Sequence, residues 1–230
     1  MNLHFITSIS KEYWYSTAKH CISTWNLPGK VTVFIDQQYG DLDWINEIPF
    51  HKRLLSVPHL KVDEFTNTAK VRKFWGKTCS QIVAVRNREE NERVIWIDSD
   101  VEQLQEIPAS LFNFSFSESV GVMNSGGTDD CWETGLVIFN QENSKLNQFM
   151  KKYENYWNDE EVLSSLWKPY DALVLGYTAE IRGFFNLCNY PCANIDALEY
   201  TRYAGYLKHW INKDNKQLLA IKKNDSNDIS

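Results

Sequence analysis

The sequence lacks the patterns that mark several common classes of protein. No stretch approaches the roughly 18 consecutive apolar residues of a membrane-spanning helix, and residues 1–10 are too mixed for a signal peptide. Basic residues are in deficit, because 24 Lys and Arg stand against 30 Asp and Glu, a net charge of −6. This balance gives nucleic acids and anionic membranes no overall attraction. We therefore expect neither a transmembrane segment nor a nucleic-acid partner.

Cysteine is scarce and scattered. The five cysteines are odd in number and form no C-x-x-C pair, so they predict neither a disulfide framework nor a structural zinc site. This usage is typical of a reducing compartment, and we expect a cytoplasmic protein.

Glycine-rich phosphate-binding motifs are also missing. G-x-G-x-x-G does not follow the first predicted strand, and G-x-x-x-x-G-K-[S/T] occurs nowhere. Such motifs bind phosphates through the backbone N–H groups of a tight turn. Their absence argues against a dinucleotide-binding fold and a P-loop enzyme.

What the chain does have is enough apolar sequence for one sizeable core, since 43% of its 230 residues are hydrophobic. We expect a single domain over residues 1–215 and a polar tail over residues 216–230. Apolar strands are predicted at residues 3–7 and 31–35, with an amphipathic helix capped by Ser10 between them. This alternation indicates an α/β fold with a mainly parallel sheet flanked by helices.

Polar residues stand where these first two strands end. In open α/β sheets, ligands bind beyond the carboxyl ends of the strands. Thr7 and Ser8 close the first strand, and Asp36 closes the second. These residues are therefore candidates for ligand binding, although a plain strand-end turn would also explain Asp36.

The most informative stretch is VIWIDSDV, residues 94–101, in which an apolar strand runs into Asp98, Ser99 and Asp100. Two carboxylates separated by one residue at a sheet edge can share a divalent cation, because hard oxygen ligands suit Mg²⁺ and Mn²⁺. The alternative is a polar turn that caps the strand.

A basic helix, predicted over about residues 68–86, precedes this strand. Lys70, Lys73 and Lys77 are spaced i, i+3 and i+7, so they align along one edge of its apolar stripe. They form either a solvated basic edge or a group from which one or two ammonium ions reach a phosphate.

The second half of the chain contains further elements and two irregular segments. Strands are predicted at residues 120–123 and 136–139, the latter preceded by Trp132, Glu133, Thr134 and Gly135, and an amphipathic helix starts at Leu146. Gly135 indicates a close backbone approach. Residues 102–119 are predicted as loop and short helix, residues 37–65 and those after 191 as irregular, and Asp171 opens a short apolar segment.

Taken in order, these motifs resemble the GT-A-type (Rossmann-like) glycosyltransferases over about residues 1–215. The strand into Asp98 and Asp100 is similar to that family's D-x-D, and the lysine-edged helix to the segment before it. The run ETGLVIFN is similar to an N/E-x-G-x-x-x-F-N strand, and His209 in GYLKHW to a late metal-binding His. The overall pattern resembles small transferases of bacterial and phage capsular or lipopolysaccharide clusters.

The resemblance implies a metal-dependent glycosyltransferase that uses a nucleotide-sugar donor, with a UDP-sugar favoured, and a glycan or other hydroxyl acceptor. Asp98, Asp100 and His209 would then hold Mn²⁺ or Mg²⁺. The expected donor-binding residues are Thr7, Ser8, Asp36, Lys73, Lys77, Asp98 and Ser99.

Glu133 and Asp171 are the candidate catalytic carboxylates. In an inverting enzyme one of them would take the acceptor proton, and in a retaining enzyme they would orient the acceptor. Trp132 and Gly135 are expected at the acceptor, while Trp167 and Trp210 could stack on sugars or pack in the core. A sugar nucleotidyltransferase and a catalytically silent carbohydrate- or nucleotide-binding domain are the alternative functions.

Overall fold

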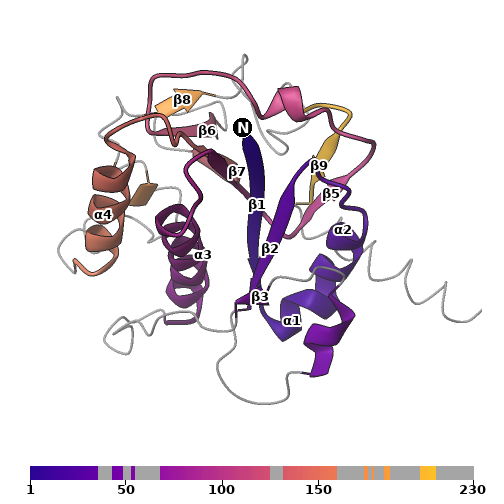
Figure 1. The fold of residues 1–230 in the computed structure, drawn as a ribbon. Helices are drawn as coiled ribbons and strands as arrows, with labels where there is room; N and C mark the ends of the chain where they lie inside the picture. Colours follow the sequence, from indigo (N-terminus) through magenta and orange to yellow (C-terminus); the bar gives the residue numbers. More distant parts are fainter. Residues whose placement is uncertain are drawn as a thin grey trace, which may run out of the picture.

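A central sheet organises the computed structural model, which describes residues 1–35, 43–48, 53–54, 68–124, 132–159, 174–175, 178, 184–186 and 203–210. Within these residues the sheet has seven strands (Figure 1). Their spatial order is β3 (Arg53–Leu54), β2 (Lys30–Ile35), β1 (Asn2–Ile9), β4 (Glu92–Ile97), β7 (Trp132–Phe139), β6 (Val120–Asn124) and β8 (Phe184–Asn186). Only β7 runs antiparallel to its neighbours, β4 and β6, so the prediction of a mainly parallel sheet is confirmed.

The central strands are apolar on both faces because helices cover both faces. In β4, Val94 and Trp96 belong to one core cluster, whereas Ile95 and Ile97 belong to the other. This alternation follows from the two-residue period of a strand. It explains why the strand reads as a continuous apolar run in the sequence.

Helices α3 (Thr68–Arg86) and α4 (Leu146–Trp157) cover one face of the sheet (Figure 1). On the other face lies a helical run made of α1 (Lys11–Tyr13), a π-helical segment (Trp14–Ala18) and α2 (Lys19–Ser23). Its N-cap is Ser10, whose Oγ accepts a hydrogen bond from the Tyr13 N–H at 3.3 Å, as predicted. Two short 3₁₀ helices, Asp43–Glu47 and Ala109–Leu111, are also present.

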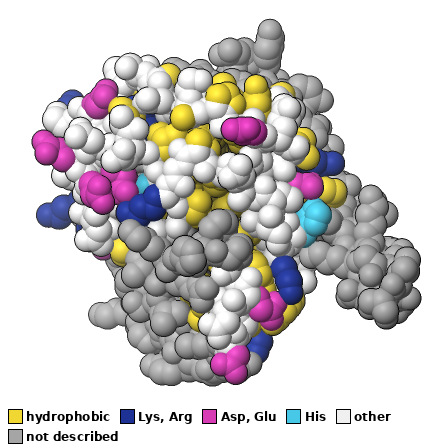
Figure 2. Space-filling view, turned by 45° about the vertical axis from the view of Figure 1, so that its right-hand side comes forward, with side chains coloured by type: hydrophobic (Ala, Val, Ile, Leu, Met, Phe, Trp, Pro, Cys, Tyr) yellow, Lys and Arg dark blue, Asp and Glu magenta, His cyan; other side chains and the backbone are white. Residues whose placement is uncertain are grey.

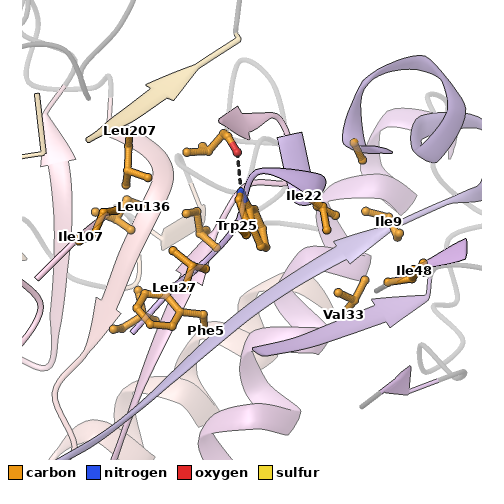
Figure 3. Packing of buried hydrophobic residues seen from close by; sticks show 14 of the residues in the cluster. Phe5, Ile9, Ile22, Trp25, Leu27, Val33, Ile48, Ile107, Leu136 and Leu207 are labelled. Atoms are coloured by element: carbon orange, nitrogen blue, oxygen red, sulfur yellow. Dashed lines mark hydrogen bonds between the residues drawn. The ribbon is translucent and has the colours of Figure 1, made fainter. Parts of the chain in front are cut away.

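A second, two-stranded sheet pairs β5 (Val101–Gln103) with β9 (Leu207–His209) in antiparallel register beside α2. The Trp25 indole donates a hydrogen bond to the Val101 carbonyl at 2.7 Å, the dashed line in Figure 3, and so ties the N-terminal helical segment to β5. The predictions of loop or irregular structure were wrong at β3, β5 and β9. These strands are only two or three residues long and carry no periodic signal.

The surface of the described residues carries both signs of charge. Acidic and basic side chains are interspersed on the face shown in Figure 2. Among the described helices, none combines the length and the apolar character that crossing a membrane would require.

Candidate metal centre

Three predicted metal ligands meet at the carboxyl end of β4. Asp98 follows the last strand residue, and its N–H donates to the Gly135 carbonyl of β7 at 2.8 Å. The chain then turns, since the Val101 N–H donates to the Asp98 carbonyl at 3.0 Å, and this turn carries Asp100. One ligand atom from each of Asp98, Asp100 and His209 lies within 4.8 Å of the others.

His209 reaches this point because β9 pairs with β5. The register places His209 opposite Val101, and the Trp210 N–H donates to the Asp100 carbonyl at 3.0 Å. His209 Nε2 lies 3.1 Å from Asp100 Oδ1 and 3.7 Å from Asp98 Oδ2. The imidazole is therefore buried between the two carboxylates.

Asp98 is held from the α3 side of the sheet. Its Oδ1 accepts hydrogen bonds from Lys77 Nζ at 2.8 Å and from the Trp96 indole at 2.6 Å. The Lys77 ammonium also donates to the carbonyl and Oγ1 of Thr134, at 2.8 and 3.1 Å. Because Lys77 is buried, with 7% of its surface exposed, it is not part of a solvated basic edge.

Asp100 is held from the opposite side by Tyr13. The Tyr13 hydroxyl donates to Asp100 Oδ2 at 2.5 Å, while Oδ1 faces His209. Burial raises the pKa of the Tyr13 phenol far above its usual range, and the negative charge of Asp100 adds to the effect. The phenol therefore remains a hydrogen-bond donor.

The chemistry of these side chains fits a divalent cation. Asp98 Oδ2 and Asp100 Oδ1, the oxygens on the His209 side, are hard ligands, and the imidazole supplies one nitrogen. Carboxylates with water suit Mg²⁺ and Mn²⁺, and imidazole is compatible with Mn²⁺.

Some of the other predicted residues lie at the same edge of the sheet. The Ser99 hydroxyl donates to the Ser8 carbonyl at 3.4 Å, which joins the end of β1 to the Asp98–Asp100 turn. Thr7 precedes Ser8 in β1 and is fully buried. The Trp210 indole donates a hydrogen bond to the Glu102 carboxylate at 2.9 Å. The Lys208 ammonium lies over the same indole, 4.3 Å from the ring centroid.

The side chains of the remaining predicted residues lie outside the described part of the structure. Asp36, Trp167, Asp171 and the predicted tail lie outside the described residues. Lys70 and Lys73 lie in α3, and Trp132 and Glu133 in β7, but their side chains fall outside the described part of the structure.

Sequence reasoning missed Tyr13, which was treated only as part of an amphipathic helix. One signal could have found it. Tyr13 is three residues after the N-cap Ser10, so it stands in the first helical turn after the carboxyl end of β1, the edge where Asp98 and Asp100 were expected.

No protein-family model and no curated protein matches this sequence. Solved structures do match. An active-site mutant of LgtC has a TM-score of 0.58 at 10% identity, covering 95% of each chain. A glycosyltransferase involved in glycosylation of the major capsid of PBCV-1 has a TM-score of 0.57 at 12% identity, covering 95% of this chain and 100% of that one.

A third structure, the glycosyltransferase GlyE of Streptococcus pneumoniae, has a TM-score of 0.56 at 13% identity. The match covers 81% of this chain but 45% of GlyE, so the chain spans less than half of that protein. At such identities the likeness concerns the fold. This chain has the GT-A glycosyltransferase fold, as the motifs predicted.

Proposed function

We propose that this protein is a metal-dependent glycosyltransferase that moves a sugar from a nucleotide-diphosphate donor to a hydroxyl group of a glycan or another acceptor. A UDP-sugar is the favoured donor. The observation that carries the proposal is the meeting of Asp98, Asp100 and His209 at the carboxyl end of β4, within a GT-A fold. The galactosyltransferase LgtC, a protein of this fold, has been solved with donor and acceptor sugar analogs, which supports the assignment.

Asp98, Asp100 and His209 would hold Mn²⁺ or Mg²⁺. A divalent ion bound there supplies Lewis-acid stabilisation of the negative charge that develops on a leaving diphosphate. Lys77 holds Asp98 in place and adds a positive charge at the same position, and Lys73 would add a second cation.

Residues at the carboxyl ends of the strands would make the other contacts with the donor. Thr7, Ser8 and Ser99 would border the donor, because the Ser99 hydroxyl already joins the ends of β1 and β4. Asp36 would accept hydrogen bonds from the base or the ribose hydroxyls of the nucleoside.

In the reaction, the bond between the anomeric carbon and the diphosphate oxygen breaks, and its electron pair leaves with the diphosphate. The acceptor oxygen forms the new bond to the anomeric carbon and loses its proton. Glu133 or Asp171 would take that proton if the configuration is inverted, and would orient the acceptor if it is retained. Trp132 and Gly135 would border the acceptor. A cytoplasmic location belongs to the same proposal and rests on the cysteine usage.

The first test is calorimetric titration of the protein with UDP, with Mn²⁺ present or with EDTA. We expect binding that needs the metal and is lost in Asp100→Ala, since one of three ligands is removed. Glu90→Ala, at an exposed residue just before the amino end of β4, serves as the control and should bind like the wild type. Metal-independent binding that Asp100→Ala leaves unchanged would refute the metal centre.

Incubation with a panel of nucleotide sugars then separates an enzyme from a binding domain. Metal-dependent release of the nucleoside diphosphate from one donor identifies both the activity and the base. Binding without turnover of any donor would favour a catalytically silent domain of the same fold.

A further inference from the structure

Tyr13 brings the N-terminal helical run into contact with the candidate metal centre. It is the last residue of α1, and its hydroxyl donates to Asp100 Oδ2 at 2.5 Å. The contact joins residues 87 positions apart in the sequence. The phenol is partly buried, so water competes only weakly for the same carboxylate oxygen.

The carboxylates of Asp98 and Asp100 are held in the same way. Asp98 accepts protein hydrogen bonds from Lys77 and Trp96 at Oδ1, and its Oδ2 lies on the His209 side. Asp100 accepts from Tyr13 at Oδ2, and its Oδ1 lies on the His209 side. Each carboxylate thus has one oxygen held by a protein donor and the other turned toward the imidazole.

Tyr13 is itself fixed relative to Asp100, because the segment that follows it is attached to β5. The Trp25 indole donates to the Val101 carbonyl at 2.7 Å, as Figure 3 shows, and the Gln103 N–H donates to Thr24 Oγ1 at 2.8 Å. His20, further along the helical run, lies 3.2 Å from Glu102. The helical run and the two residues after it therefore contact the residues that directly follow Asp100.

We infer that Tyr13 is a positioning residue of the metal centre: its hydroxyl fixes the Asp100 carboxylate so that Oδ1 is presented to a divalent cation together with Asp98 Oδ2 and His209 Nε2. The inference rests on the proposed function. Carboxylates that bind metals are generally held by hydrogen bonds of this kind, and removing such a partner lowers metal affinity by about 10- to 100-fold.

The test is calorimetric titration of the full chain with MnCl₂ alone, without nucleotide. In Tyr13→Phe, which removes only the hydroxyl, we expect Mn²⁺ affinity to fall about 10-fold or more. The matched control is Tyr15→Phe, because that exposed hydroxyl donates to Glu47 at 2.7 Å, away from the centre, and its loss should leave the affinity unchanged. Thermal unfolding of the metal-free proteins is measured in parallel.

The outcomes separate the inference from the proposed function. If the wild type binds Mn²⁺ and Tyr13→Phe binds it equally well, the inference is overturned while the proposed function stands. A lower Tm with unchanged affinity also overturns it, because the hydroxyl would then only stabilise the fold. If the wild type binds no Mn²⁺, both the proposed metal centre and the positioning role of Tyr13 are refuted. Tyr13→Met, which also lacks the hydroxyl, gives the same comparison if the phenylalanine variant does not fold.

Discussion

At the scale of single residues, buried charged side chains in the described part of the protein have several partners each. Lys77 donates to Asp98 and to two atoms of Thr134. Arg93, fully buried in β4, donates to the carbonyls of Phe112 and Phe114 and to Gln141. An ion removed from water is tolerated only when such partners replace its hydration, so losing one partner is costly.

Arg93 offers a test of this dependence. Burial lowers the pKa of its guanidinium, because desolvation disfavours the charged form. Arg93→Met should lower the free energy of unfolding by about 2–4 kcal/mol, because a buried and a partly buried carbonyl lose their donor. Urea unfolding followed by circular dichroism measures the change. Arg86→Met is the control, since that exposed side chain only pairs with Glu154 at the surface, and should cost less than about 1 kcal/mol.

At the scale of the elements, the connection between α2 and β2 lies directly against the backbone of β1. A Cβ atom built on Gly29 would stand 2.3 Å from the Leu3 carbonyl oxygen. No rotation of a side chain can relieve such a clash, because the neighbouring atom belongs to the backbone of a central strand.

Gly29→Ala should therefore lower the free energy of unfolding by about 1–3 kcal/mol, the usual cost of forcing extra volume into a packed site. Thermal and urea unfolding measure it. Gly29→Ser carries the same Cβ and should be at least as unstable. Wild-type stability in both variants would show that the connection can move away from β1.

Local patterns predicted most of the elements, and long-range pairing accounts for those they missed. The helix expected at residues 68–86 is α3, because its apolar stripe repeats over several turns. Strands β5 and β9 have three residues each and are stabilised by one another, so neither has a local signal. At the site, Asp98 and Asp100 followed from a strand end and His209 from the family resemblance. The position of Tyr13 in the first helical turn after β1 indicates the correct edge of the sheet, but its contact with Asp100, 87 residues away, follows only from the fold.

At the scale of the whole molecule, polar clusters occupy opposite ends of β4. The candidate metal centre follows its carboxyl end, whereas Glu92 at its amino end pairs with Lys30 at 3.0 Å and with His4 at 3.2 Å. Burial acts to raise the pKa of Glu92, but the hydrogen bond from Lys30 and the charges of His4 and Lys30 outweigh it. The pKa is therefore lowered overall.

This shift fixes the direction of a pH effect. Because the folded pKa lies below the unfolded value of about 4.3, the Glu92 carboxylate stabilises the fold above that pH, and the contribution disappears as pH falls through the folded pKa. Glu92→Gln should thus be clearly less stable than the wild type at pH 7, with the gap narrowing below about pH 4. Urea unfolding at several pH values measures the gap, with the exposed Glu90→Gln as control. A gap that does not vary with pH would contradict the assignment.

The pairing of β9 with β5 has a consequence for the order in which the protein is made. His209 leaves the ribosome 109 residues after Asp100. The nascent chain can complete β1, β2 and β4 with both carboxylates in place while the imidazole has not yet been synthesised. Closing so long a loop costs entropy, which a three-residue strand and the packing of Tyr203 against Phe112 must offset. The candidate metal centre is therefore completed late in synthesis, because β9, the last of the described strands, supplies its imidazole.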